Sequence, residues 1–262
     1  FFFKQKTAYE IRNCDWSSDV CSSDLSLEIY EGETFVILGP SGCGKSVTLK
    51  IITGLLKPDA GDVTVAGKNL TLIREPELNK IRRNMGMLFQ NAALFDSLTV
   101  GENISFGLDQ SGTYSREDVA EIISKNLDLV GLGGIENKMP SELSGGMRKR
   151  VGLARAIALH PKIIIYDEPT TGLDPIVATE IDQLVVKLQA ELKATSVVIT
   201  HDLNSAFRVA DRMALHYDGR LLEVADPWTF RNTTNPIVQR FLRGESENKS
   251  KSDQYAFKGQ FS

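Results

Sequence analysis

One glycine-rich stretch constrains this chain more than any other feature, and it reads Gly39-Pro40-Ser41-Gly42-Cys43-Gly44-Lys45-Ser46. An apolar run, Thr34 to Leu38, precedes it, and a second apolar segment opens at Val47. This order predicts a strand, a glycine-rich loop and a helix. Glycine allows the loop to curl until several backbone N–H groups line one concavity, which suits phosphate oxygens.

The residues at the end of this loop add charge to the predicted phosphate site. The helix N-terminus contributes a partial positive charge and Lys45 a full one. Ser46 offers a hydroxyl to a Mg²⁺ ion held against the phosphates. We therefore predict a P-loop that binds a nucleotide and Mg²⁺ through residues 39–46 and Val47. A chance glycine-rich turn is the alternative, and the strand–loop–helix context argues against it.

Length and charge narrow the classes of protein that can carry this loop. The 262 residues suit one large α/β domain, with or without an inserted subdomain. A formal net charge of −4 argues against a general nucleic-acid-binding protein. No apolar run approaches the roughly 20 residues that span a bilayer, and no signal-peptide pattern is present. Cys14, Cys21 and Cys43 suit neither a zinc site nor a disulfide framework, so we expect a cytosolic protein.

Residues 1–24 differ from the rest of the chain. Three leading Phe residues precede a stretch rich in Ser, Asp and Cys, and neither a strand nor a helix period persists. We interpret this segment as a non-native head that resembles translated vector or sequencing-adapter sequence, fused at about Leu25. An irregular native hairpin is the alternative. Resequencing the locus from independent DNA separates the two, because recovery of the same head would exclude the artefact.

Residues 25–243 are predicted to form an α/β domain. We expect strands at 25–30, 34–38, 62–67 and 85–90, and a helix from Lys45 that carries Leu49, Ile52 and Leu56. Continuous apolar runs at 163–166 and 196–200 indicate parallel strands covered on both faces, joined by a helix around 181–192. Another helix is expected at 148–159, and an Asp-Gly turn within 213–223 predicts a late hairpin.

Two segments depart from this pattern. Helices and loops replace strands between about 91 and 142, and a helix at 118–130 has one apolar face, so we predict an inserted helical subdomain. Residues 244–262 are polar with few large aliphatic side chains, which predicts a flexible tail. Anchoring of this tail on a partner through its aromatic residues is the alternative.

An acidic pair closes the apolar strand at 163–166. Asp167 is placed to hold Mg²⁺ through its water shell, and Glu168 to orient or deprotonate an attacking water. A helix-capping pair is the alternative, but the strand leads straight into residues 169–174. Together with the P-loop, the pair predicts nucleotide hydrolysis.

Three more positions suggest contacts with the nucleotide. Ser144-Gly145-Gly146 at a helix start is a second anion-binding terminus, with a plain N-cap as the alternative. Because one nucleotide does not need two cradles, we expect a dimer in which each chain's second cradle closes over the other's nucleotide. His201 is the first residue past the strand at 196–200, at the edge where ligands bind open α/β sheets. Gln90 also ends a predicted strand. Without this context, His201 would be interpreted as a structural histidine and Gln90 as a surface amide.

Six motifs in this order resemble the nucleotide-binding subunit of an ABC transporter, from about Leu25 to Phe241. Residues 39–46 match the Walker A motif, 163–168 the Walker B motif and 143–147 the signature sequence. Gln90 matches the Q-loop, Asp174 the D-loop and His201 the switch histidine.

The resemblance implies a P-loop α/β core of ABC type with a helical subdomain and a small antiparallel β part. It implies ATP and Mg²⁺ as ligands, with Ser46, Gln90 and Asp167 at the metal. Ser144, Gly145, Gly146 and Asp174 would contact nucleotide, whereas Glu168, His201 and Gln90 would act in hydrolysis. It also implies a homodimer around two ATPs, coupled to an integral membrane permease at the cytoplasmic face of the inner membrane.

Two positions depart from the family pattern. Met147 stands where most members have Gln, which should spare the intact Ser144-Gly145-Gly146 cradle. The aromatic residue that stacks on adenine would fall within residues 1–24, where Trp16 lies near the expected spacing. If the head is non-native, base stacking worth roughly 1–3 kcal/mol would be missing.

Residues 89–100 and 143–150 resemble the ATPases of Mla-type phospholipid transport. Amino-acid importers tend to have Pro where Asp96 stands and Gln where Met147 stands. The resemblance implies an MCE-type lipid-binding protein and a small regulatory subunit as further partners. The alternatives are an importer for amino acids or another small solute, and a soluble ABC ATPase that acts on DNA or ribosomes. A catalytically inactive nucleotide binder is a third alternative, against which the intact Lys45 and Glu168 argue.

Overall fold

The computed structural model describes residues 3–12 and 20–245, with side chains from Leu25 onward. Its centre is a six-stranded sheet in the order β10-β9-β3-β8-β7-β6. These strands are β3 (Thr34–Leu38), β6 (Met85–Leu88), β7 (Ile163–Asp167), β8 (Thr195–Thr200), β9 (Arg212–Tyr217) and β10 (Arg220–Ala225). Neighbours from β6 through β9 pair in parallel, and β10 pairs antiparallel with β9.

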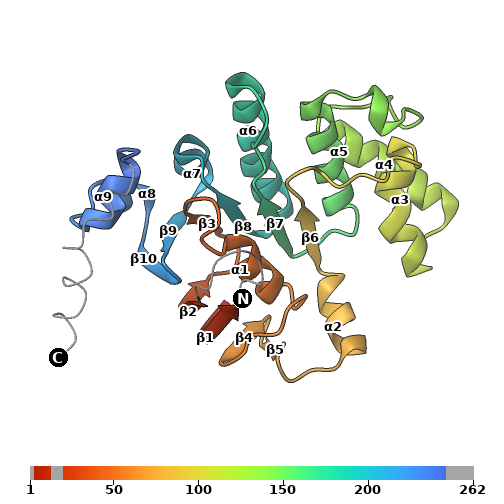
Figure 1. The fold of residues 1–262 in the computed structure, drawn as a ribbon. Helices are drawn as coiled ribbons and strands as arrows, with labels where there is room; N and C mark the ends of the chain where they lie inside the picture. The colour runs from red at the N-terminus through yellow and green to blue at the C-terminus, as the bar shows by residue number, and fades with distance from the viewer. Residues whose placement is uncertain (1–2, 13–19, 246–262) are drawn as a thin grey trace.

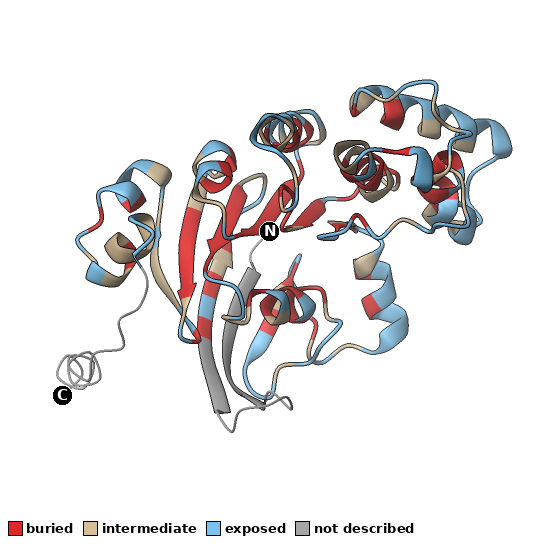
Figure 2. Ribbon diagram, turned by 45° about the horizontal axis from the view of Figure 1, so that its top comes forward, coloured by how far each residue is buried: buried red, intermediate tan, exposed pale blue. Residues whose placement is uncertain are grey.

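Both faces of this sheet are covered, as the continuous apolar runs predicted. Figure 2 shows α5 (Gly145–Ile157), α6 (Pro175–Leu192) and α7 (Leu203–Val209) over one face, and α1 (Lys45–Ile52) over the other. The alternating side chains of β3 enter two separate cores. Val36 and Leu38 pack into the core under α5 and α6, whereas Phe35 and Ile37 pack into the core against α1.

A second, four-stranded antiparallel sheet lies on the α1 side, in the order β2-β1-β4-β5. Its strands are β1 (Phe3–Arg12), β2 (Val20–Ile29), β4 (Asp62–Val65) and β5 (Lys68–Asn69). The strand expected at 25–30 is the second half of β2, so the small antiparallel part is confirmed. The non-native origin of residues 1–24 stays a hypothesis about the DNA. Trp16 and Cys14 lie outside the described residues.

The segment expected to be a helical subdomain contains α3 (Val100–Ser111), α4 (Arg116–Leu129) and the 3-10 turn η1 (Pro140–Glu142). These elements lie beside α5 at one end of the sheet (Figure 1). Capping boxes at Thr99 and Ser115 begin the two α-helices. Buried residues of α3 and α4 belong to the same core cluster as α5 and α6. The subdomain therefore packs onto the sheet layer instead of forming a core of its own.

Several predicted boundaries need correction. α1 ends at Ile52, because Gly54 turns the backbone at φ 69° and leaves Leu56 44% exposed. The helix expected at 148–159 begins earlier, at Gly145, where Ser144 is the N-cap. α6 begins at Pro175, capped by Asp174. The short helices α2 (Glu75–Arg82), α8 (Pro227–Arg231) and α9 (Pro236–Leu242) had no predicted counterpart.

The late hairpin is confirmed as β9 and β10. Its two turn residues, Asp218 and Gly219, have φ values of 47° and 72°, which a two-residue primed turn requires. α8 and α9 follow it at the opposite end of the sheet from the helical segment (Figure 1). Residues 246–262 lie outside the described part. Among the described helices, none has the length and apolarity needed to cross a bilayer.

Gly86 of β6 offers a test of the packing between sheet and α5. A Cβ atom at this position would lie 2.2 Å from the carbonyl oxygen of Ala156. Because that neighbour is backbone, we expect Gly86→Ala to lower the free energy of unfolding by about 1–3 kcal/mol in urea titrations. Gly107→Ala is the matched control, since its Cβ would make only ordinary contact, 3.4 Å from Leu159 Cδ1. Equal stability of the two variants would contradict the close packing.

Candidate functional site

Four polar segments meet at one edge of the six-stranded sheet. Because β3, β6, β7 and β8 are parallel, their carboxyl ends share that edge. The registers place Leu38 beside Thr200 and Asp167 beside Ile199. The residues that follow these strands therefore come together: the glycine-rich loop, Gln90, Glu168 and His201.

The glycine-rich loop has the backbone geometry expected of a phosphate cradle. Gly42 and Gly44 have φ values of 84° and 101°, which other residues rarely adopt. Position 39 has no room for a side chain, because a Cβ there would lie 2.5 Å from the carbonyl oxygen of His216. Val47 N–H donates back to the carbonyl of Gly44 at 3.0 Å. The N–H groups of Lys45 and Ser46, at the start of α1, make no such turn bond in the described structure, as expected of the first residues of a helix.

Lys45 holds its charge at the centre of this edge. Lys45 is only 6% exposed, and its Nζ donates hydrogen bonds to the carbonyls of Gly39 at 2.7 Å and Pro40 at 2.8 Å. Nζ also lies 3.9 Å from Glu168 Oε1. The ammonium therefore sits between the loop and the acidic pair, where a phosphate oxygen can replace a carbonyl as its acceptor.

Glu168 is held in an unusual conformation. Its φ of 50° is left-handed, a region that non-glycine residues occupy at a cost and often at functional sites. Its N–H donates to the carbonyl of Ile199 at 2.8 Å. Its Oε2 lies 2.8 Å from Nδ1 of His201 and accepts a 3.0 Å hydrogen bond from Thr171 Oγ1. A buried carboxylate anchored on three sides is suited to act as a general base.

The residues expected at the metal fit Mg²⁺ in chemistry. Asp167, at the end of β7, has its pKa raised by burial first and by the adjacent Glu168 second. A bound cation would relieve both effects, and Asp167, Ser46 and Gln90 all offer the hard oxygen ligands that Mg²⁺ prefers. The described residues hold no group of three or more His, Cys, Asp or Glu side chains that could bind a metal ion by themselves.

Sequence reasoning did not identify Lys149, although it lies in the basic run 148–150 that follows the signature sequence. Its Nζ donates to the carbonyl of Glu168 at 3.0 Å and to the carbonyl of Gln90. Burial lowers the pKa of Lys149 to about 8, while Asp167 and Glu168 oppose the shift. Gln90 itself is exposed, so its amide is available to a ligand at the edge.

The second predicted cradle lies apart from the first. Ser144 caps α5 by accepting from Met147 N at 3.2 Å, and Asp174 caps α6 by accepting from Ile176 and Val177. A Cβ at Gly146 would lie 2.6 Å from Val177 Cγ1, so these two helix starts are adjacent. Across the described residues, no hydrogen bond joins either helix start to residues 39–46. Within the described residues, the second cradle is therefore not hydrogen-bonded to the glycine-rich loop of its own chain.

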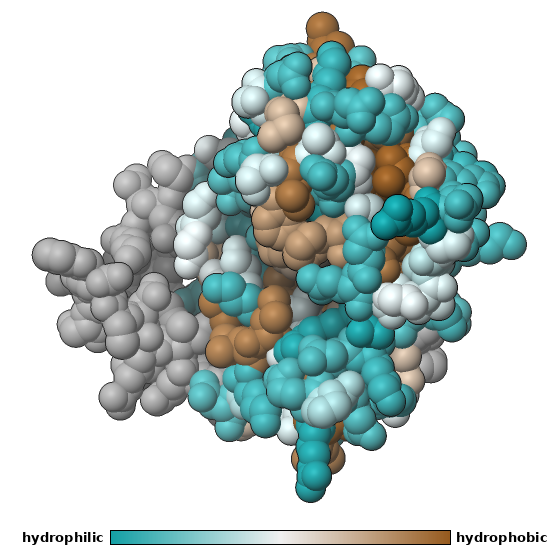
Figure 3. Space-filling view, turned by 90° about the vertical axis from the view of Figure 1, so that its right-hand side faces the viewer, coloured by the Kyte–Doolittle hydropathy of each residue, from teal (hydrophilic) through white to brown (hydrophobic). Residues whose placement is uncertain are grey.

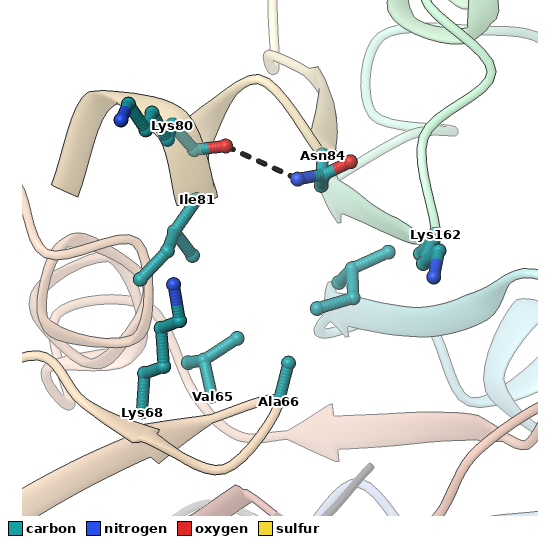
Figure 4. A pocket seen from close by; sticks show the side chains of 8 residues that line it. Val65, Ala66, Lys68, Lys80, Ile81, Asn84 and Lys162 are labelled. Atoms are coloured by element: carbon teal, nitrogen blue, oxygen red, sulfur yellow. Dashed lines mark hydrogen bonds between the residues drawn. The ribbon is translucent and has the colours of Figure 1, made fainter. Parts of the chain in front are cut away.

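A cavity of about 190 Å³ lies elsewhere, at the amino-terminal end of β7 (Figure 4). Asn84 closes one side by donating to the carbonyl of Lys80 at 3.1 Å. The cavity is lined by Val65, Ala66, Lys68, Lys80, Ile81, Asn84, Lys162 and Ile163. None of these is a predicted site residue, and the cavity lies at the opposite end of β7 from the acidic pair.

His216 lies beneath the glycine-rich loop, and its burial makes the free energy of unfolding of the chain depend on pH. The residue is fully buried, and its Nδ1 lies 3.1 Å from Cys43 Sγ. Burial, and then the charge of Lys45, lower the pKa of His216 to about 4. The unfolded chain takes up this proton near pH 6.5, whereas the folded chain does not until about pH 4. The free energy of unfolding should therefore fall by about 3 kcal/mol as pH drops through that window.

Urea titrations between pH 7 and pH 4 check this dependence, with His216→Gln as the comparison. The variant should lose stability less steeply than the wild type over this range, because it lacks the proton uptake. Parallel curves for the two proteins would show that His216 does not carry the effect.

Both the sequence and the fold are similar to those of known proteins. The family profile described as "ABC transporter" matches residues 22–171. The "Probable ribonucleotide transport ATP-binding protein mkl" of Mycobacterium leprae is 41% identical over 84% of this chain and 64% of its own. This chain thus spans somewhat less than two thirds of that relative. The "Protein TRIGALACTOSYLDIACYLGLYCEROL 3, chloroplastic" of Arabidopsis thaliana is 40% identical, over 84% of this chain and 68% of its own.

Two further similarities bear on the site and on the substrate. The "Methionine import ATP-binding protein MetN" of Geobacillus kaustophilus is 42% identical over 84% of this chain and 64% of its own. Among solved structures, a dimeric ATP-binding cassette in a post-hydrolysis state, bound to ADP and Pi, has a TM-score of 0.77 and 33% identity. That match covers 87% of this chain and 99% of the other.

Proposed function

Because the chain belongs to the ABC transporter family and carries its ATPase domain, we propose that it is the ATP-hydrolysing subunit of a phospholipid transporter. Two copies would enclose two ATPs with Mg²⁺, each P-loop facing the Ser144-Gly145-Gly146 cradle of the other copy. Closure and opening of this homodimer would drive an integral membrane permease. The subunit would be peripheral, at the cytoplasmic face of the inner membrane.

The observation that carries the ATPase proposal is the anchored Glu168 beside Lys45. Oε2 of Glu168 lies within hydrogen-bond distance of His201 Nδ1. Oε1 of the same carboxylate lies 3.9 Å from the ammonium of Lys45. This arrangement supplies a base, a phosphate-binding cation and an imidazole at one sheet edge. The direct test is to incubate the purified chain with ATP and Mg²⁺ and to measure ATP hydrolysis as the release of phosphate.

Exposed residues support the dimer. Ser144 and Asp174 are exposed, although both belong to predicted nucleotide contacts. Ile176, two residues after Asp174, is 73% exposed. An exposed apolar side chain beside exposed cradle residues suits a surface that a second copy covers. The similar solved cassette, a dimer bound to ADP and Pi, supports the same arrangement.

Apolar residues near Gln90 support the membrane partner. Figure 3 views the side that bears the helical segment and shows apolar side chains among hydrophilic ones. Phe89, Phe95 and Phe106 are 40%, 42% and 38% exposed, and the rings of Phe95 and Phe106 lie 4.6 Å apart. We propose that a permease contacts this surface, so that Gln90 senses it.

The choice of phospholipid as substrate rests on resemblance within the family. Residues 89–100 and 143–150 resemble Mla-type ATPases, with Asp96 and Met147 as distinguishing positions. The Arabidopsis relative, which is named after a glycerolipid, supports a lipid substrate. On this proposal an MCE-type lipid-binding protein and a small regulatory subunit complete the complex.

An importer of a small solute is the second candidate, favoured by the 42% identity to the methionine import protein. The gene neighbourhood separates the candidates most cheaply. A permease gene beside an MCE-domain gene supports the lipid proposal, whereas a gene for a periplasmic solute-binding protein supports the importer. Co-purification with the permease and mass spectrometry of extracted lipids then tests the substrate directly: bound phospholipid is expected, and its absence together with bound amino acid or nucleotide would overturn the proposal.

A further inference from the structure

The helix α5 is attached to the loop after β6 by charged side chains on one of its faces. Lys149 is 4% exposed, and its Nζ reaches the backbone carbonyls of Gln90 and Glu168. Six residues later, Arg155 donates to the carbonyls of Ala92 at 2.6 Å and Ala93 at 2.7 Å. Both cations bind backbone rather than carboxylates, so their contacts fix the path of the chain.

The same face approaches the loop closely between those two cations. A Cβ at Gly152 would lie 2.8 Å from Leu88 Cδ1 and 3.2 Å from Ala92 Cβ. Ala92 and Ala93 have φ values of 60° and 46°, so the loop adopts a left-handed path that alanine does not favour. Such a conformation persists where its surroundings hold it. The contacts from α5 provide that restraint.

Lys149 is the contact that connects two parts of the site. Gln90 follows β6 and Glu168 follows β7, and the side chain of Glu168 is the one anchored by His201 and Thr171. Both carbonyls accept a hydrogen bond from the buried ammonium of Lys149. In the sequence, Lys149 is 59 residues from Gln90 and 19 residues from Glu168. A single side chain thus fixes the distance between the loop after β6 and the loop after β7.

We propose that Lys149 is a positioning residue that holds Gln90 and Glu168 in register with α5, the helix that Ser144 caps. A displacement of the loop at Gln90 is then transmitted to the backbone of Glu168 and to α5 together. The inference rests on the proposed ATPase function and assigns Lys149 no contact with nucleotide. Its role is to keep the base in place while the loop beside it moves.

Steady-state kinetics of Lys149→Met and Lys149→Arg test the proposal. We expect Lys149→Met to lower kcat at least about tenfold while KM for ATP changes less than about threefold, because the P-loop is untouched. Lys149→Arg keeps a donor that can reach both carbonyls and should recover most of the rate. Lys125→Met, at a 70% exposed lysine of α4, is the matched control and should leave both constants unchanged.

Hydrogen exchange of the same proteins separates positioning from general destabilisation. Amides of residues 89–93 and 168–171 should exchange at least about tenfold faster in Lys149→Met, while those of α1 keep wild-type protection. Uniformly faster exchange, or a kcat within twofold of the wild type, would overturn the proposal. An inactive wild-type protein would instead refute the ATPase function, so the two failures are distinguishable.

Discussion

Glu168→Gln should bind ATP and hydrolyse almost none of it. The amide preserves the shape of the side chain but cannot accept the proton of an attacking water, so kcat should fall about 10²–10⁴-fold. The Kd for ATP should change little, because Lys45 and the loop remain intact. Phosphate release measures the first quantity and fluorescent-nucleotide titration the second. With hydrolysis blocked, ATP-bound dimers should accumulate in size-exclusion chromatography.

The control for this variant is Glu121→Gln, which removes an exposed carboxylate paired with Lys125 on α4. It should hydrolyse ATP at the wild-type rate. Hydrolysis at that same rate by Glu168→Gln would refute the assignment of the base. The contacts of Glu168 with His201 and Thr171 would then have only a structural role.

Lys45→Ala should fail at the earlier step of binding. The variant loses a charged donor to phosphate, and such hydrogen bonds contribute about 1.5–3 kcal/mol each. The Kd for ATP should therefore rise roughly 10- to 100-fold in fluorescent-nucleotide titrations. The carbonyls of Gly39 and Pro40 also lose their donor, so thermal unfolding should confirm that the variant is folded.

Lys50→Ala is the matched control, because Lys50 lies on the same helix but is exposed. Its Kd for ATP should equal that of the wild type. An equal loss of affinity in both variants would show that net charge, not the position of Lys45, determines binding.

The shared edge of the sheet follows from local signals, because each candidate site segment comes after a predicted strand. The continuous apolar runs at 163–166 and 196–200 predicted parallel strands covered on both faces, and parallel strands bring their carboxyl ends to one edge. The structure shows two covered faces at β3, whose alternate side chains enter two cores. These conclusions needed only the order of short segments.

Other features depend on contacts between distant residues and gave no signal in the sequence. Cys43 and His216 are 173 residues apart, and only the pairing of β9 with β3 places the imidazole beneath the loop. The left-handed backbone of Glu168 follows from its hydrogen bond to Ile199 on the neighbouring strand. Helix ends were also misjudged, as at Leu56, where an apolar residue continued the pattern after Gly54 had ended the helix.

We propose that each catalytic site needs two chains, with Glu168 from one and the Ser144-Gly145-Gly146 cradle from the other. Mixing two inactive variants, Glu168→Gln and Ser144→Arg, before adding ATP tests this shared site. In a mixed dimer one site carries both defects and the other carries neither. The mixture should therefore regain roughly a quarter of the wild-type ATPase rate, since half the dimers are mixed and each has one intact site. Activity no higher than the sum of the separate variants would contradict the shared site.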